Sequence, residues 1–249
     1  MFSLFICACI FVVGVIWYMT YYRWFKETQP VPKIIHQLAP QDTSKWPNVW
    51  YECQASWKKQ YPDYQYMLWT DEKMDEFMQH EFPSYYEMYK SYPLQIHRID
   101  AVRYFILYKY GGIYADMDIV VLKDFMPRVN RHKIHILESP YKDNEYCQNA
   151  LMISPVRHPF WLCVFEELKR SRYRMSILDV AGPRMIDRSM QSWWLAGICL
   201  RTLPYEFFNP HKGTIDSICK ENLYTIHYGT CSYANPPPTY KADEEENQT

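Results

Sequence analysis

One stretch of this chain decides its fold: His97-Arg-Ile-Asp-Ala-Val-Arg-Tyr-Phe-Ile-Leu-Tyr-Lys-Tyr-Gly-Gly-Ile-Tyr-Ala-Asp-Met-Asp118. Apolar residues recur at helical spacing and predict a helix over about 94–110 with one core-facing side, formed by Ile99, Val102, Ile106 and Tyr110. Gly111 and Gly112 end this helix and allow a tight turn. The apolar run 113–121 then predicts a buried strand that carries Asp116 and Asp118.

The two aspartates are two residues apart, so on a strand both carboxylates point to the same face. Two hard oxygen donors suit Mg²⁺ or Mn²⁺, and a diphosphate would complete an octahedral shell. Because buried carboxylates need a partner, the pattern predicts that Asp116 and Asp118 hold a metal-bound nucleotide. The alternative is that each aspartate caps the backbone or pairs with a basic group.

Asp100 and Arg103 are three residues apart on the predicted helix and therefore neighbours on its surface. They form either a structural ion pair or a pair that binds sugar hydroxyls, with Arg103 also compensating phosphate charge.

Elsewhere, strand-like runs alternate with helical ones, which predicts an α/β sheet. Strands are expected at 33–37, 64–69, 113–121, 134–138, 149–154, 205–208 and 224–228. Helices are expected at 48–60, 71–82, 84–92, 94–110, 159–170 and 184–195, with Thr70 as an N-cap.

Length and charge bound the function. A chain of 249 residues can bury one α/β domain, and a net charge of -1 with acids and bases mixed argues against a nucleic-acid partner. The 23 Tyr and 9 Trp fit sugar or base stacking, but they fit an aromatic core at least as well.

The N-terminal segment is apolar, since no charged residue occurs from Phe2 to Tyr22. A helix of that length extends roughly 31 Å and can cross a bilayer. We therefore expect a transmembrane anchor at 1–24 and prefer it to a cleaved signal peptide, because no basic n-region or small-residue cleavage pattern is present. The basic residues after the span favour a cytosolic domain, but they are too few to settle the orientation.

A stem at 25–32, a single domain at 33–235 and a disordered acidic tail at 236–249 complete the expected organisation.

The cysteines show no paired CxxC spacing, which argues against a zinc site. They leave two alternatives open: disulfides, for example between Cys219 and Cys231, or buried free thiols.

Three segments resemble the DXD sugar-binding region glycosyltransferases (glycosyltransferase family 32): Pro32-Lys-Ile-Ile-His-Gln37, Pro62-Asp-Tyr-Gln-Tyr-Met-Leu-Trp-Thr-Asp71 and Arg98–Asp118. The family includes the fungal initiating α-1,6-mannosyltransferases and the mannosyl-inositol-phosphoceramide synthases. Ser154-Pro-Val-Arg-His-Pro-Phe-Trp161 and Ala181-Gly-Pro183 are most similar to the latter. The resemblance runs through residues 32 to 235.

The resemblance implies a GT-A fold, which is a Rossmann-like nucleotide-sugar-binding domain, and retaining transfer with Mn²⁺ or Mg²⁺. It favours GDP-mannose as the donor, although relatives use UDP-galactose, UDP-glucose or UDP-N-acetylglucosamine. It also implies a lipid or glycan acceptor such as inositol-phosphoceramide, a regulatory subunit as a partner, and a Golgi or ER membrane location.

The family roles carry over residue by residue. Asp116 and Asp118 would hold the metal and diphosphate, and Asp100 and Arg103 would contact the donor sugar. The nucleotide sugar would also lie near His36, Gln37, Tyr114 and Asn149. His227 would be a further metal or phosphate ligand, with a surface histidine as the alternative. The segment Thr230-Cys-Ser-Tyr233 differs from the family, which usually has small residues with a Trp at this place. Whether the C-terminal segment closes over the site as a lid therefore stays open.

Two other classes of protein share part of this pattern. An aspartyl-phosphate phosphatase also uses Asp-x-Asp after a strand, but Val120 stands where it needs a threonine. A non-catalytic sugar-binding subunit is disfavoured because the acidic and basic residues of the motif are intact.

Overall fold

The structure is a computed structural model and describes residues 12, 15, 29–143, 145–193, 196–210 and 222–230. In this part of the chain, no helix combines the length and apolar character needed to cross a membrane. The predicted anchor at 1–24 lies outside the described residues apart from Val12 and Val15, and the acidic tail at 236–249 lies wholly outside them.

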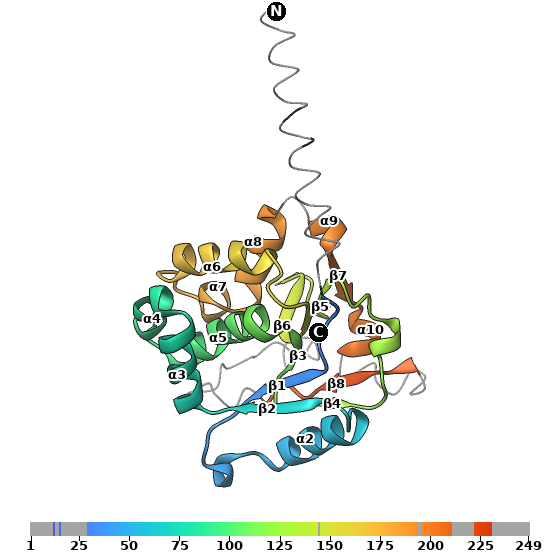
Figure 1. Cartoon of the computed structure of the whole chain (residues 1–249). Helices are drawn as coiled ribbons and strands as arrows, with labels where there is room; N and C mark the ends of the chain where they lie inside the picture. The colour runs from blue at the N-terminus through green and yellow to red at the C-terminus, as the bar shows by residue number, and fades with distance from the viewer. Residues whose placement is uncertain are drawn as a thin grey trace, which may run out of the picture.

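The centre of the molecule is a six-stranded sheet with the order β2-β1-β3-β6-β5-β7 (Figure 1). Its strands are β1 (Ile34–Leu38), β2 (Gln65–Trp69), β3 (Gly112–Ala115), β5 (Ile134–Glu138), β6 (Cys147–Ser154) and β7 (Leu200–Leu203). β1 pairs in parallel with β2 and β3, β6 runs antiparallel between β3 and β5, and β7 pairs in parallel with β5. The predicted α/β architecture is confirmed.

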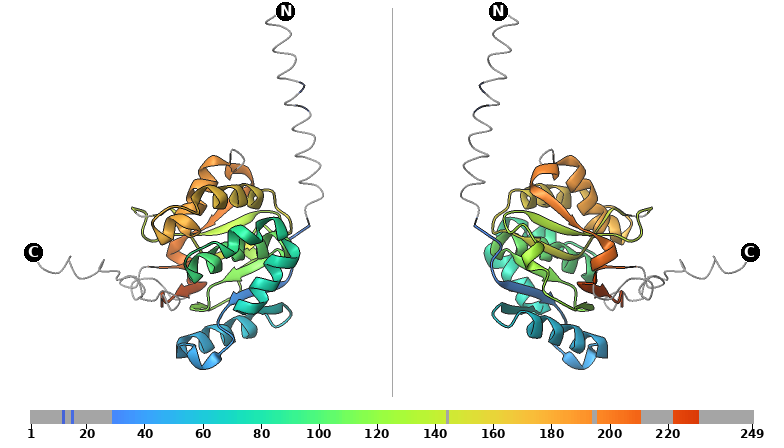
Figure 2. Two further views of the ribbon diagram at one scale, coloured as in Figure 1. Left: turned by 90° about the vertical axis from the view of Figure 1, so that its left-hand side faces the viewer. Right: turned by 90° about the vertical axis from the view of Figure 1, so that its right-hand side faces the viewer.

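Helices cover both faces of this sheet (Figure 2). One face packs against α3 (Asp71–Glu81), α4 (Pro83–Lys90), α5 (Gln95–Tyr110), α6 (Phe160–Ser171), α7 (Ile177–Val180) and α8 (Pro183–Ser192). The other face packs against α2 (Asn48–Gln60), α10 (Tyr205–Phe208) and the 3₁₀ turn η2 (Met126–Arg128). The short helices η1 (Thr43–Lys45) and α9 (Ala196–Cys199) lie in connections.

Helix α5 is the central helix of the first layer. It lies against α6, where the Phe105 and Phe165 rings stack with centroids 4.0 Å apart. Gly111 ends it with φ +62°, and Gly112 follows with φ +93°. A Cβ at Gly112 would lie 2.5 Å from the carbonyl oxygen of Ile34, so only glycine lets β3 approach β1 this closely.

The predicted single strand at 113–121 is wrong, because the chain turns in its middle. β3 ends at Ala115, and β4 (Ile119–Val121) pairs with β8 (Thr225–His227) in a separate two-stranded sheet. The hydrogen bond from the Ile119 amide to the Asp116 carbonyl, at 3.2 Å, closes the turn. Asp116 and Asp118 therefore lie in a turn between two sheets, and strand alternation does not explain why they are close together.

Two further predictions need correction. Residues 205–208 form helix α10 instead of a strand, with the Asn209 amide donating to the Tyr205 carbonyl at 2.8 Å and Phe208 packed in the core. Strand β7 was not expected from the sequence pattern.

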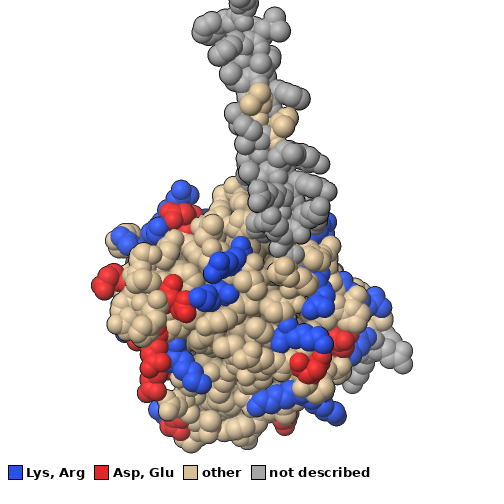
Figure 3. Space-filling model, in the orientation of Figure 1, with Lys and Arg blue, Asp and Glu red and all other residues tan. Residues whose placement is uncertain are grey.

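The described cysteines are thiols, and Cys53 and Cys147 are buried. The predicted pair Cys219 and Cys231 lies outside the described residues. On the face drawn in Figure 3, basic and acidic side chains are interspersed.

Candidate active site at the end of β3

The candidate site lies at one edge of the main sheet. β1, β2 and β3 are parallel, so their carboxyl ends meet at this edge, where ligands of open α/β sheets usually bind. Asp116 follows directly after β3, and its amide donates to the Ala150 carbonyl at 2.8 Å. The backbone at this position is therefore fixed by the neighbouring strand β6.

Three ligand groups converge here: the carboxylates of Asp116 and Asp118 and the imidazole of His227 offer atoms that all lie within 4.8 Å of one another. His227 reaches the site because β8 pairs with β4, which places His227 opposite Ile119. Its Nε2 lies 3.2 Å from Asp118 Oδ1. Two carboxylates and one imidazole suit Mn²⁺, and the carboxylates also suit Mg²⁺, so the donor set fits the predicted cation.

Asp116 is held on one oxygen only. Its Oδ1 accepts hydrogen bonds from Arg103 Nη1 at 3.1 Å and from the Tyr114 hydroxyl at 2.5 Å. Its Oδ2 accepts no hydrogen bond from the residues that the structure describes. Burial raises the pKa of Asp116, and the Arg103 guanidinium offsets only part of that effect. The arrangement orients Asp116 and leaves one oxygen available to a ligand.

Asp118 is held by the C-terminal segment. Its Oδ2 accepts the Thr230 amide at 2.7 Å and the Thr230 hydroxyl at 2.9 Å. Burial alone would raise the pKa of Asp118, but His227 and Thr230 outweigh it and hold that pKa well below its ordinary value. Trp50 Nε1 in turn donates to Thr230 Oγ1 at 3.2 Å. Sequence reasoning missed Thr230 as a site residue, because its only signal was that it follows His227 closely.

Asp100, Arg103 and Asn149 form one network beside the aspartates. Arg103 Nη2 pairs with Asp100 Oδ1 at 2.7 Å, and its Nη1 donates to the Asn149 carbonyl at 3.0 Å. The Asn149 amide donates to Asp100 Oδ1 at 3.1 Å. The Arg103 guanidinium also lies over the Tyr114 ring, 4.7 Å from its centroid. The structure thus brings Asp100, Arg103, Tyr114 and Asn149 together, with Asp100 and Arg103 forming an ion pair. Their contact with a donor sugar stays a prediction.

Burial raises the pKa of Asp100 to about 6, although the Arg103 charge acts in the opposite direction. For Arg103, burial lowers the pKa, but the surrounding Asp116, Tyr114 and Asp100 outweigh it, so the guanidinium stays charged.

The two polar residues of β1 point to opposite faces of the sheet. Gln37 Nε2 donates to the Asp116 carbonyl at 3.1 Å, and Gln37 Oε1 accepts the Tyr66 hydroxyl at 2.6 Å. His36 is fully buried, with Nε2 bonded to the Gly111 carbonyl and Nδ1 accepting from Trp69 Nε1. His36 therefore lies in the core while Gln37 faces Asp116, because adjacent strand residues alternate between faces. The nucleotide contact of His36 stays a prediction.

Comparison with known proteins identifies the region that carries this geometry. Residues 47–135 match the family model described as the glycosyltransferase sugar-binding region containing DXD motif. The matched region contains Asp100, Arg103, Asp116 and Asp118.

Similar proteins include fungal mannosyltransferases. The chain is 36% identical over 172 residues to inositol phosphoceramide mannosyltransferase 3 of Schizosaccharomyces pombe, which covers 67% of this chain and 47% of the relative. It is 32% identical over 209 residues to mannosyl phosphorylinositol ceramide synthase SUR1 of Saccharomyces cerevisiae, and this match covers 80% of this chain and 53% of the relative. It is 30% identical over 134 residues to the initiation-specific alpha-1,6-mannosyltransferase of Saccharomyces cerevisiae, and this match covers 49% of this chain and 28% of the relative. The chain spans about half the length of the first two relatives.

Among solved structures, the UDP-bound glycosyltransferase domain from the YGT toxin matches with a TM-score of 0.50 and 8% identity, covering 70% of this chain and 80% of that one. At that identity the likeness concerns the fold alone, which is of the GT-A type. The match of residues 47–135 to the DXD sugar-binding region and the similarity to fungal mannosyltransferases thus both make this chain similar to glycosyltransferases.

Proposed function

We propose that this chain is a metal-dependent retaining glycosyltransferase that transfers a hexose, with mannose favoured, from a nucleotide sugar to a lipid or glycan acceptor. The observation that carries the proposal is the convergence of Asp116, Asp118 and His227 at the carboxyl edge of the sheet. This cluster includes the two aspartates of the matched sugar-binding region.

The metal-binding residues would be Asp116, through its available Oδ2, together with Asp118 and His227. A bound Mn²⁺ or Mg²⁺ would supply positive charge to the departing diphosphate. Arg103 holds Asp116 in place and adds a second positive charge at the site, while Thr230 holds Asp118 ionised. These contacts preorganise the site before a donor binds, so little reorganisation is needed during transfer.

The donor sugar would contact the network of Asp100, Arg103 and Asn149. A carboxylate and an amide next to a guanidinium can each bind sugar hydroxyls. Asp100 is held by Arg103 and Asn149, which makes it a binding residue in this proposal and not a nucleophile.

The acceptor is proposed from the relatives. One of those compared above is named as an inositol phosphoceramide mannosyltransferase and another as a mannosyl phosphorylinositol ceramide synthase, and both names favour an inositol-phosphoceramide acceptor. A lipid acceptor agrees with the apolar segment from Phe2 to Tyr22 as an anchor in a Golgi or ER membrane. A regulatory subunit remains a prediction.

The proposal is tested by donor hydrolysis and transfer in the purified full chain, with Mn²⁺ and a panel of GDP- and UDP-sugars. We expect Asp116→Asn and Asp118→Asn each to lower turnover by roughly 100-fold or more, because each removes charge from the metal site. Asp63→Asn is the matched control, because Asp63 is an exposed acid that precedes β2 and so lies at the opposite, amino end of the parallel strands. Near-normal turnover of either site variant, or equal turnover of the wild type with and without chelator, would contradict the proposal.

A further inference from the structure

A basic segment covers the end of α6 and the loop that follows it. Residues 169–175 read Lys-Arg-Ser-Arg-Tyr-Arg-Met, so four of the seven side chains are basic and none is acidic. The segment also holds two exposed large side chains, Tyr173 at 78% exposure and Met175 at 99%. Neither the metal site nor the core of the sheet accounts for these two side chains.

The three arginines of the basic segment carry charge that the described chain does not pair. The side chains of Arg170, Arg172 and Arg174 form no hydrogen bond or ion pair with any residue that the structure describes. Arg172 Cζ lies 4.5 Å from the centroid of the Tyr173 ring, and Arg172 Nε is buried without a partner in the same part of the chain. A guanidinium in this condition is a ready donor to a phosphate, which it binds through two parallel hydrogen bonds.

The acidic side chains close to the basic segment do not neutralise it. Glu166 pairs with Lys169 at 2.7 Å, and Glu167 pairs with Arg188 at 2.8 Å. The exposed Glu87 of α4 borders the segment and forms no ion pair with the described residues. One such acid beside three unpaired arginines leaves this surface with a net positive charge.

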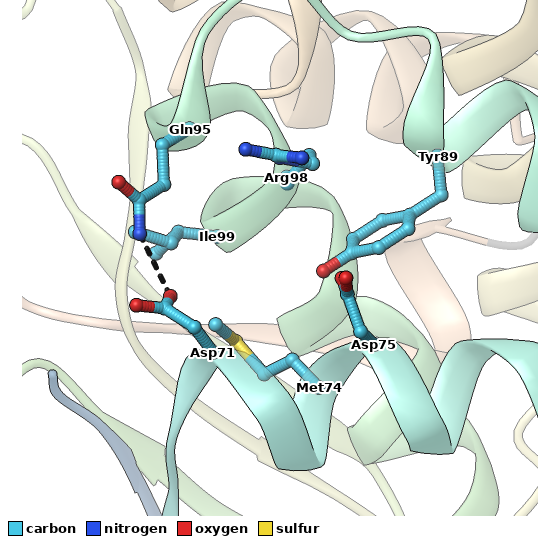
Figure 4. Close-up of a pocket in the computed structure, with 7 residues that line it drawn as sticks. All are labelled: Asp71, Met74, Asp75, Tyr89, Gln95, Arg98 and Ile99. Carbon is cyan, nitrogen blue, oxygen red and sulfur yellow. Dashed lines mark hydrogen bonds between the residues drawn. The ribbon is translucent and has the colours of Figure 1, made fainter. Parts of the chain in front are cut away.

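The segment borders a hollow of about 610 Å³ at the end of α4. The lining residues are Glu87, Met88, Ser91, Pro93, Arg172, Tyr173 and Arg174. The α4 wall is fixed on α3, because Lys90 Nζ donates to Asp75 Oδ2 at 2.6 Å. Figure 4 shows the hydroxyl of Tyr89 beside the same carboxylate. The volume lies in the range of pockets that bind small molecules, roughly 300–1,000 Å³, so it admits a lipid headgroup.

The base of the loop is fixed to the donor network. Ser171 Oγ donates to the Val180 carbonyl at 2.6 Å, which joins the two ends of the loop. The hydroxyl of Tyr104 donates to the next carbonyl, that of Ala181, at 2.7 Å. The same hydroxyl accepts from Asn149 Nδ2 at 2.9 Å. The exposed part of the basic segment therefore extends from a base that contacts the donor network.

The basic segment also lies on the same side of the molecule as the metal site. Arg103, in the middle of α5, reaches Asp116 at the end of β3, with Nη1 3.1 Å from Oδ1. Because α5 ends at the Gly111 turn into β3, its first turns extend past the end of β3 on the side of the site. Pro93, two residues before α5, lines the hollow together with Arg172. The segment and the metal site thus both lie toward the carboxyl ends of the parallel strands.

The chain enters the domain at the opposite edge. The Val31 amide donates to the Arg131 carbonyl at 2.7 Å, and β1 begins three residues later. The anchor expected at 1–24 therefore holds the domain near the amino end of β1. One attachment point leaves the domain free to rotate relative to a bilayer. A second contact beside the metal site would keep that site turned toward an acceptor held in the membrane.

We propose that the basic segment docks on the anionic headgroups of the bilayer that holds the anchor, and so turns the metal site toward that bilayer. The three arginines donate to headgroup phosphates. Tyr173 lies at the interface, where an aromatic ring with a polar tip is favoured, and Met175 extends into the apolar layer. The inference goes beyond the proposed function, because it concerns where the domain is held and not which sugar it transfers.

Lipid fits the basic segment better than nucleic acid does. Proteins that bind single strands without sequence preference stack successive bases on several aromatic rings along a basic groove, whereas this segment offers only the Tyr173 ring. Met175, at 99% exposure, has no ring to stack on a base. Its apolar side chain is instead covered when it enters the acyl layer of a membrane.

The experiment places the photoreactive residue p-benzoylphenylalanine at position 173 of the full chain, reconstituted in lipid nanodiscs. Discs of phosphatidylcholine alone are compared with discs that also contain phosphatidylserine, and mass spectrometry measures the lipid adduct after irradiation. We expect at least about fivefold more adduct in the anionic discs, since each basic residue near an anionic surface contributes about that factor. Salt at about 0.5 M should remove the difference, because it screens exposed charges.

Arg172→Gln combined with Arg174→Gln should bring the adduct in anionic discs to within about twofold of its value in neutral discs. Lys58→Gln combined with Lys59→Gln is the matched control, because these two exposed bases lie at the end of α2, on the other face of the sheet. The control should keep the difference that the wild type shows.

Equal adduct in the two kinds of disc overturns the inference, and so does a difference that persists in the arginine variant. An adduct that single-stranded RNA displaces would assign the segment to nucleic acid and overturn it as well. Sugar transfer is measured on the same samples. Normal transfer without a charge-dependent adduct contradicts docking and leaves the proposed function intact, whereas a charge-dependent adduct without transfer does the reverse.

Discussion

Thr230 shows how much one residue controls at this site. Its amide and hydroxyl both donate to Asp118 Oδ2, and Trp50 fixes the same hydroxyl. Two hydrogen bonds to one carboxylate oxygen favour the ionised form and direct the other oxygen toward His227. The departure from the family pattern after His227 therefore supplies a contact of its own to the metal site.

We predict that Thr230→Val lowers Mn²⁺ affinity about 10-fold, because Asp118 loses the hydroxyl donor while the backbone amide remains. Thr230→Ser keeps the hydroxyl and should bind Mn²⁺ like the wild type. Metal titration followed by calorimetry measures both variants. Equal affinities of Thr230→Val and Thr230→Ser would show that the hydroxyl contributes nothing to the site.

At the scale of elements, two glycines lie in comparable turns: Gly111 joins α5 to β3, and Gly229 follows β8. Gly111 and Gly229 share the same φ of +62°, but their surroundings differ. A Cβ at Gly111 would meet the Ser154 carbonyl oxygen at 2.8 Å and Pro32 Cδ at 2.9 Å, whereas a Cβ at Gly229 meets nothing within 4 Å. Gly111 also has ψ −156°, a region that only glycine adopts readily, so both its backbone and its surroundings disfavour a side chain.

We predict that Gly229→Ala costs about 1–2 kcal/mol of unfolding free energy through positive φ alone. Gly111→Ala adds the clash and should cost about 2–5 kcal/mol, because the contacting backbone atoms cannot move without shifting β6. Urea unfolding of the two variants and the wild type gives the comparison. A Gly111→Ala variant no less stable than Gly229→Ala would contradict the close packing of α5, β3 and β6.

At the scale of the whole molecule, buried histidines connect separate elements. His36 in β1 joins the end of α5, through the Gly111 carbonyl, to Trp69 in β2. Burial lowers its pKa to about 4, and burial likewise lowers the pKa of His135 to about 4 and of His158 to about 3. All three are neutral in the folded chain near pH 7, and protonation of His36 Nδ1 would break its bond from Trp69.

The sign of the pH effect follows from these lowered pKa values. The unfolded chain takes up protons below about pH 6.5, and the folded chain resists them until about pH 4, so each histidine destabilises the fold as pH falls through that window. The raised pKa of Asp100 acts in the opposite direction. We therefore predict the effect of His36 by comparing the wild type with His36→Gln. As pH falls through this window, the unfolding free energy of the wild type should decrease by up to about 1.4 kcal/mol more per pH unit than that of His36→Gln.

Urea unfolding at pH 7.5, 6.5 and 5.5 measures this slope. His80→Gln is the control, because His80 is an exposed histidine of α3. It should keep the wild-type slope. A His36→Gln slope equal to that of the wild type would show that His36 is not held neutral.

Local patterns in the sequence predicted much of this architecture. The helix at 48–60, the N-cap at Thr70 and the strand at 134–138 agree with the structure, because each depends on residues close together in the chain. The run 205–208 forms a helix and not the strand that its pattern predicts, since short aromatic runs fit a strand or a helix equally well and tertiary packing decides between them.

The sequence by itself determined the helix α5, its glycine end and the pair Asp116 and Asp118, because helical periodicity, positive φ and carboxylate chemistry are local properties. Only the tertiary structure decided that the pair lies in a turn, that β8 brings His227 and Thr230 to it, and that His36 belongs to the core. Those facts depend on pairing between β4 and β8, which lie about a hundred residues apart. No local pattern encodes which distant strand will complete such a pair.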